Sequence, residues 1–287
     1  MEATGHFELK LASSPSRPNA ALKGRSSTIR CLMVCTSGLY SDLAPAVQSK
    51  AKQREWRRAK VTTTEFVAQL DGRIAKYDLL CHPFYKAWTA DELTREDLRD
   101  YARNYFQQVN AFPEYLSVFA LRLPQGELRR AVLANHDDEM GLHGSRPHFE
   151  LWLDFLEGMG GGRHGATTSI AEIGALMSTF HSVARAGSPE EALAAFYAYE
   201  SQVPRVAAEK DRGLREMYGA DAQTRGYFTL HAIADVYHSR VWKQQLSKMV
   251  ESNPRAAERA LLAAESAAKA LWTALDGIEA ARMARAA

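Results

Sequence analysis

Cysteine is scarce in this sequence, and the features of several common protein classes are missing. The 287 residues include three cysteines, Cys31, Cys35 and Cys81, a sparse and odd-numbered set that provides no disulfide framework. Such a set is typical of a reducing compartment, so we expect a cytoplasmic protein. No apolar run approaches the roughly 20 residues that a membrane-spanning helix needs, and the N-terminus lacks the order of a signal peptide. We therefore expect no membrane partner.

Positive and negative charges nearly balance, with a net charge of +2, but they are unevenly distributed. Residues 1–60 hold eleven Lys and Arg against four Asp and Glu, a net charge of +7, so residues 61–287 carry −5. The larger part has no basic stripe that could follow a phosphate backbone, and nucleic acid is not an expected partner. Residues 1–60 mix Ser, Arg, Pro and Gly without periodicity, which predicts a disordered basic extension before one domain over residues 61–287.

Alternation of apolar and polar residues, the pattern of a half-buried strand, is also absent, whereas helical periodicity runs through most of residues 61–287. Thr94 precedes Asp97 by three residues, and Ser188 precedes Glu191 by three, so both pairs predict capping boxes at helix starts. We expect Pro113 to kink its helix. The sequence predicts an all-α bundle of about seven to eight helices.

The segment "HAIADVYH" places three ionisable side chains on one stripe of a predicted helix. His231, Asp235 and His238 have offsets of 0, 4 and 7, which correspond to about 0°, 40° and −20° on the helix circumference. Tyr227 and Trp242 extend the same stripe by one turn at each end. We therefore expect the stripe to face the core, where its ionisable side chains need something to bind.

Glu200 is the best partner on another predicted helix. Phe196, Val203 and Ala207 share its side, so its carboxylate lies on an apolar face. Pro204 lacks the N–H that the Glu200 carbonyl would otherwise bond, and it therefore predicts a kink at this point. An ordinary polar residue at the edge of the stripe is the alternative interpretation.

A second source of ligands is the segment "NHDDEMGLHGSRPHFELW". Its ionisable residues are His136, Asp137, Asp138, Glu139, His143 and His148. Glu139 and His148 are nine residues apart, so they converge only if the intervening Gly and Pro residues break the helix. His136, Glu139 and His143 would share a face without any break. Asp137 and Asp138 are more simply solvated acids at a helix end, and the sequence does not choose between these sets.

Three histidines and three carboxylates from four helices suit a pair of divalent first-row metal ions, because bundles build such sites from inward-facing side chains. The mixture of imidazole and carboxylate favours iron or manganese over magnesium, which prefers oxygen ligands alone. Three carboxylates against two divalent ions would leave about one positive charge, which could help to bind anions derived from dioxygen.

Four segments resemble the haem-oxygenase-like di-metal oxidases: "HPFYKAW", "DDEMG" with "HFELW", "YESQVPRVAAEK" and "HAIADVYH". The likeness covers residues 61–287 and is closest to the CADD-type branch, which makes para-aminobenzoate for folate. It implies two metal ions, Fe/Fe or Fe/Mn, with dioxygen and a reductant as co-substrates. By position, the implied ligands are Glu139, His148, Glu200, His231, Asp235 and His238. The spacing between Glu139 and His148 departs from the family pattern, so Asp138 and His143 stay open as replacements.

The resemblance also implies that the protein consumes itself. CADD-type enzymes use their own tyrosine as the source of the aromatic ring and a lysine as the source of the amino group, and the matching residues are Tyr85 and Lys210. Tyr199 and Tyr227 match further tyrosines near that site. From the sequence alone, Tyr85 is more simply a packed aromatic residue, and Lys210 could point inward or outward.

Two other enzymes of the same fold remain as rival interpretations: a di-metal oxidase of an external small substrate and a cofactor-free PqqC-like oxidase. A helical interaction protein is the rival without enzymatic activity. The electron donor and the oligomeric state stay open, and a homodimer is one option for the latter.

Overall fold

Every regular element that the structure describes is a helix. The computed structural model describes residues 62–163 and 168–286, and these ranges contain no strand, so the expected all-α fold is confirmed. None of the described helices is both long enough and apolar enough to cross a membrane. The predicted basic extension of residues 1–60 lies outside the described residues.

The elements follow one another in the order α2 (Thr63–Ala75), η1 (Leu79–Cys81), α3 (Pro83–Thr89), α4 (Arg95–Arg122), α5 (Glu127–Glu139), α6 (His148–Gly158), α7 (Ala171–Ala186), α8 (Pro189–Glu200), α9 (Val203–Glu216), α10 (Ala222–Ser252), η2 (Pro254–Ala256) and α11 (Ala257–Ala286).

Side-chain caps fix the starts of the main helices. Thr94 and Asp97 form the expected capping box of α4, because each side chain accepts from the other's backbone N–H. Ser188 and Glu191 form the second expected box at α8. Asp221 caps α10 by accepting a backbone N–H of its first turn. Each cap satisfies N–H groups that a helix leaves unbonded at its start.

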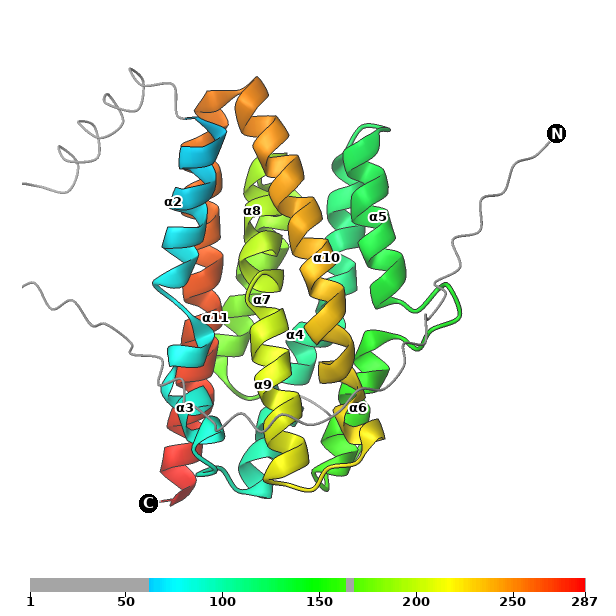
Figure 1. Ribbon diagram of the computed structural model, residues 1–287, viewed down its shortest axis with the longest axis vertical. Helices are drawn as coiled ribbons and strands as arrows, with labels where there is room; N and C mark the ends of the chain where they lie inside the picture. The colour runs from blue at the N-terminus through cyan, green and yellow to red at the C-terminus, as the bar shows by residue number, and fades with distance from the viewer. Residues whose placement is uncertain (1–61, 164–167, 287) are drawn as a thin grey trace, which may run out of the picture. The chain divides into compact units, whose positions relative to one another are not determined.

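The helix α8 occupies the centre of the bundle (Figure 1). All its residues from Ala192 to Glu200 are buried, which explains why its sequence is apolar on every side. α11 packs against α8, α7 and α2, while α10 packs against α9, α6 and α8, and α4 packs against α7, α5 and α6. α4 itself continues without interruption through Pro113.

The helix that the sequence predicts across Pro204 is divided into two, α8 and α9. α8 ends at Glu200 and α9 begins at Val203, so Pro204 lies in the first turn of α9, where its missing N–H is not needed. Between the two helices, the buried Gln202 accepts the backbone N–H of Leu79 at 3.1 Å. This break sets the buried carboxylate of Glu200 at the end of the central helix.

The connection between α5 and α6 separates two candidate ligands along the chain. α5 ends at Glu139 and α6 begins at His148. Gly141 has a φ of +67°, and a Cβ there would lie 2.6 Å from the carbonyl oxygen of Ser145, so this turn requires glycine. The helix break on which the convergence of Glu139 and His148 depends is therefore present.

Two helical glycines provide a test of this packing. A Cβ on Gly213 in α9 would overlap the indole nitrogen of Trp88 and lie 2.7 Å from Cε of Met217, whereas one on Gly72 in α2 would meet nothing within 4 Å. Gly213→Ala should lower the free energy of unfolding by about 1–3 kcal/mol because of overpacking. Gly72→Ala should raise it by about 0.5–1 kcal/mol. Urea denaturation measures both changes in the free energy of unfolding. A Gly213→Ala variant as stable as the native protein would contradict the described packing.

Candidate metal centre

Six buried acidic and imidazole side chains form two groups. The first consists of Glu139, His148 and His231, and the second consists of Glu200, Asp235 and His238. Within each group, one possible ligand atom from every residue lies within 4.8 Å of the others. The six residues come from α5, α6, α8 and α10, and each, taken as a whole residue, is at most 4% exposed.

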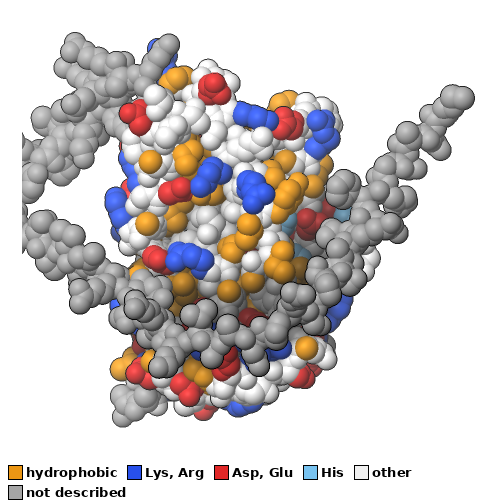
Figure 2. Space-filling model, in the orientation of Figure 1, with side chains coloured by type: hydrophobic (Ala, Val, Ile, Leu, Met, Phe, Trp, Pro, Cys, Tyr) orange, Lys and Arg blue, Asp and Glu red, His pale blue; other side chains and the backbone are white. Residues whose placement is uncertain are grey.

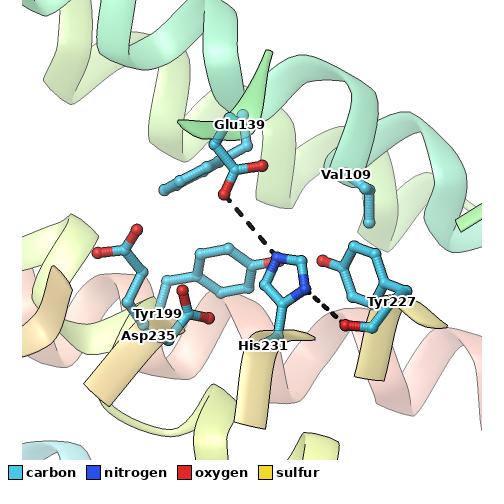
Figure 3. A pocket seen from close by; sticks show the side chains of 8 residues that line it. Val109, Glu139, Tyr199, Tyr227, His231 and Asp235 are labelled. Carbon is cyan, nitrogen blue, oxygen red and sulfur yellow. Dashed lines mark hydrogen bonds and ion pairs between the residues drawn. The ribbon is translucent and has the colours of Figure 1, made fainter. Parts of the chain in front are cut away.

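In the first group, two histidines face one carboxylate. His148 Nδ1 lies 2.9 Å from Glu139 Oε2, and His231 Nε2 lies 3.9 Å from Glu139 Oε1. The other ring nitrogen of His231, Nδ1, lies 2.7 Å from the carbonyl oxygen of Tyr227 (Figure 3). Because a carbonyl only accepts, Nδ1 carries the hydrogen and donates it, so that Nε2 is directed toward Glu139.

Electrostatics within the first group favour charged side chains. Burial raises the pKa of Glu139, but the charges and hydrogen bonds of His148 and His231 outweigh burial and hold this pKa well below its usual range. Burial lowers the pKa of His231, but Asp235 and Glu139 more than compensate and raise it above its ordinary value. Glu139 is therefore a carboxylate, which is the state that ligates a metal ion.

In the second group, Glu200 is held by two donors. Asn135 Nδ2 donates to Glu200 Oε1 at 2.7 Å, and the indole N–H of Trp242 donates to Oε2. Burial raises the pKa of Glu200 to about 8, and the nearby charge of Asp235 adds to that shift, while His238 opposes it. Glu200 therefore holds a proton most of the time at neutral pH.

His238 completes the second group. Its Nδ1 lies 3.2 Å from Asp235 Oδ1 and 3.8 Å from Glu200 Oε1, and its Nε2 lies 3.1 Å from Asp138 Oδ2. Burial lowers the pKa of His238, but the hydrogen bonds with Asp138 and Asp235 raise it to about 11. The imidazolium compensates part of the negative charge of this group.

The chemistry of these donors fits a metal centre. Among the described residues, the ion pairs of Glu139, Glu200 and Asp235 involve histidines and no Lys or Arg. Buried carboxylates are costly unless they are paired or coordinate metals. Imidazole and carboxylate together suit first-row transition metals. The two groups could thus each hold one divalent ion.

A narrow pocket connects the two groups. Its lining includes residues of both groups together with Val109, Phe112, Tyr199 and Tyr227. Figure 3 shows Glu139 directed from one side of the pocket toward His231 on the other. The lining side chains leave almost no open space between them.

Lys210 lies in a separate aromatic cluster and points inward. It is 5% exposed, and its Nζ lies 4.9 Å from the centre of the Tyr85 ring and 4.6 Å from that of Tyr101. Nζ donates to the hydroxyl of Tyr101, whose oxygen lies 3.1 Å from that of Tyr85. Burial lowers the pKa of Lys210 well below its ordinary value and raises that of Tyr85. Burial therefore favours the neutral form of both the amine and the phenol.

Five tyrosines connect this cluster with the pocket. Tyr227 and Tyr199 line the pocket, and Tyr199 lies close enough to both Tyr227 and Tyr105 to influence the pKa of their hydroxyl groups. The Tyr105 ring stacks on that of Tyr101 with centroids 5.6 Å apart, and Tyr101 bonds Tyr85. Sequence reasoning missed Tyr101 and Tyr105, although their spacing of four residues on α4 places them on one helix face.

The competing ligand set is not brought together. His143 is exposed, and His136 lies 3.0 Å from Asp137 rather than beside either group. Asp138 contacts His238 on the side opposite Asp235 and does not join either group of three. The geometry therefore favours Glu139 and His148 over the alternatives that the sequence left open.

The two buried indoles Trp242 and Trp88 test the bond to Glu200. Both are almost fully buried, but the N–H of Trp88 has no hydrogen-bond partner among the described residues. Trp242→Phe should therefore reduce the free energy of unfolding of the metal-free protein by about 1.5–3 kcal/mol more than Trp88→Phe does, because it leaves a buried carboxylate without a donor. Urea denaturation at pH 9, where Glu200 is ionised, gives both values. Equal losses would show that this bond contributes nothing.

Two solved structures share the fold. A TenA homologue from Pseudomonas syringae pv. tomato has a TM-score of 0.63 at 16% identity and covers 77% of this chain and 96% of that chain. A domain of unknown function with a haem-oxygenase-like fold from Shewanella denitrificans has a TM-score of 0.60 at 14% identity and covers 82% of this chain and 93% of that chain. These likenesses establish the expected haem-oxygenase-like fold.

Sequence relatives give the family. The 4-aminobenzoate synthase of Nitrosomonas europaea is 38% identical over 230 residues, which are 76% of this chain and 92% of the relative. The 4-aminobenzoate synthase of Chlamydia muridarum is 34% identical over 220 residues, which are 76% of this chain and 91% of the relative. The family described as iron-containing redox enzymes matches residues 99–272. The chain therefore belongs to the iron-containing redox enzymes with a haem-oxygenase-like fold, in the same family as these 4-aminobenzoate synthases.

Proposed function

We propose that this protein makes 4-aminobenzoate (para-aminobenzoate) for folate biosynthesis, taking the ring from its own Tyr85 and the amino nitrogen from Lys210. The observation that carries the proposal is the position of Lys210 Nζ, 4.9 Å from the centre of the buried Tyr85 ring. The relatives named 4-aminobenzoate synthase support the product.

The six residues of the two buried groups would hold two divalent ions, Fe/Fe or Fe/Mn. When bound, these ions supply the activation of dioxygen, with electrons from a donor that remains to be identified. Glu139, Glu200 and Asp235 compensate their positive charge, and the apolar side chains of Val109 and Phe112 keep the pocket dry. The protein thus fixes geometry and excludes water.

Tyr85 is outside the pocket, so its oxidation requires a route from the pocket to its ring. The phenols of Tyr227, Tyr199, Tyr105 and Tyr101 offer such a route, since each lies near the next. Loss of a hydrogen atom from one phenol can be compensated by transfer from its neighbour. Tyr199 and Tyr227 would begin this route and Tyr85 would end it.

Lys210 is suited to give up its nitrogen because burial favours its neutral form. The lowered pKa raises the share of Lys210 that keeps its lone pair, compared with an ordinary solvated lysine. The surrounding rings of Tyr85, Tyr101, Trp152 and Phe228 leave the amine facing aromatic carbon rather than solvent. The narrow pocket supports an internal rather than an external substrate.

Isotope labelling tests the proposed function directly. Protein labelled with ring-¹³C tyrosine and ε-¹⁵N lysine, supplied with ferrous iron, a reductant and dioxygen, should release doubly labelled 4-aminobenzoate, with at most about one molecule per chain because the source is consumed. Peptide mass spectrometry should show loss of mass at Tyr85 and Lys210. Tyr85→Phe should abolish the product. The control is Tyr197, whose hydroxyl donates to Asp71 at 2.5 Å, and Tyr197→Phe should still give the product.

The labelling experiment, together with a genetic rescue, separates the rival functions. Unlabelled 4-aminobenzoate with an unchanged chain would mean an external substrate. Oxidation activity in the absence of bound metal would mean a cofactor-free oxidase. Rescue of a 4-aminobenzoate auxotroph by both the native chain and Tyr85→Phe would remove the sacrificial role from Tyr85 while keeping the synthase activity.

Metal binding should depend on pH. Glu200 has a pKa of about 8 and His238 one of about 11 in the metal-free protein, and both must lose a proton to ligate a metal ion. Both pKa values lie above the ordinary ones, so a metal ion competes with protons for these two side chains. As the pH is lowered, the metal affinity should therefore fall roughly tenfold per pH unit for each proton displaced. Titration with Mn²⁺ between pH 6 and 8, in buffers of different ionisation enthalpy, measures both effects. Affinity and enthalpy that are independent of pH and buffer would contradict this expectation.

A further inference from the structure

Two consecutive residues of α5 contact different groups of the metal centre. Glu139 belongs to the first group, whereas Asp138 reaches His238 of the second group, with its Oδ2 3.1 Å from His238 Nε2. His238 is located on α10, 100 residues further along the chain. The end of α5 therefore joins both groups to α10.

The imidazole of His238 lies between two sets of carboxylates. Its Nδ1 faces Asp235 at 3.2 Å and Glu200 at 3.8 Å, while its Nε2 faces Asp138. An ionised carboxylate can only accept, so Nε2 must carry the hydrogen that bonds Asp138. When the imidazole ligates, its free lone pair is then on Nδ1, directed at the second group.

Asp138 differs from the carboxylates of the two groups in its exposure. Its side chain is 51% exposed, whereas that of Glu139 is 6% exposed and that of Asp235 is 3% exposed. Figure 2 shows histidine and acidic side chains meeting at the surface beside the C-terminal end of α5. A half-exposed carboxylate on the far side of the ring is placed to orient His238 and is not itself one of the three residues of the second group.

We propose that Asp138 is a positioning residue that fixes the orientation and tautomer of His238, so that Nδ1 rather than Nε2 ligates the metal ion of the second group. The inference rests on the proposed function only in so far as these six residues bind metal. His231 is held in a similar way, but its two ring nitrogens have exchanged roles: its Nδ1 donates to the Tyr227 carbonyl, and its Nε2 faces the first group. The two histidines of α10 would thus ligate through different nitrogens.

Metal affinity tests the proposal without reference to turnover. The full chain is titrated anaerobically with Mn²⁺ against a fluorescent chelator, and the native protein should bind two ions. Asp138→Ala should weaken the binding of one ion about 10- to 100-fold, which is the typical effect of losing the hydrogen-bond partner of a ligating histidine. The affinity for the other ion should not change. Asp138→Asn keeps an oxygen that can accept from Nε2 and should retain more of the affinity.

The neighbouring acid provides the matched control. Asp137 follows His136 on the same turn and bonds it at 3.0 Å, so Asp137→Ala removes the same charge without touching His238 and should leave both affinities unchanged. His238→Ala, which removes the ligand itself, should abolish binding of one ion. An effect of Asp137→Ala equal to that of Asp138→Ala would reduce the role of Asp138 to surface charge and overturn the proposal.

The tautomer is a readout that a merely structural role would not change. In Zn²⁺-loaded protein with ¹⁵N-labelled histidine, nuclear magnetic resonance should show a hydrogen on Nε2 of His238 and metal on Nδ1 in the native chain. In Asp138→Ala this Nε2–H should exchange faster with water. Metal on Nε2 of the native His238, or unchanged affinity in Asp138→Ala, would overturn this proposal alone, whereas a native chain that binds no metal would overturn the proposed function as well.

Discussion

Burial of three carboxylates and three imidazoles among apolar helices is the constraint on which the rest of the structure depends. Charges removed from water cost free energy unless opposite charges or hydrogen bonds compensate them. Here histidines from α6 and α10 face carboxylates from α5, α8 and α10, and Asn135 and Trp242 donate to the most enclosed carboxylate, Glu200. The same donor set that makes the metal-free core tolerable is one that divalent ions prefer.

Two interruptions in the helices bring these ligands together. The break between α8 and α9 leaves Glu200 at the end of the central helix, and the turn at Gly141 returns the chain so that His148 meets Glu139. Both interruptions run against the general preference for continuous helices. Local rules are often broken in this way at functional sites, where geometry matters more than helix length.

The two buried groups and the pair formed by Lys210 and Tyr85 have different environments. The two groups consist of acidic and imidazole side chains that are paired with one another, whereas Lys210 is surrounded by aromatic rings and its burial favours the neutral amine. A neutral amine beside a neutral phenol is stable in such surroundings because neither group carries charge that needs solvent. The tyrosines between them, which include Tyr105 and Tyr199, provide contact without opening the site to water.

The sequence by itself determined whatever depends on one helix. His231, Asp235 and His238 share a face because 3.6-residue periodicity fixes their directions, and the capping boxes of α4 and α8 depend on residues three apart. Only the tertiary structure decided which helices meet. The pairing of Glu139 with His148 needed the path of a glycine-bearing turn, and the contact of Asp138 with His238 joins residues 100 positions apart. Such contacts follow from how several helices pack at once, and helical spacing within one segment carries no information about that packing.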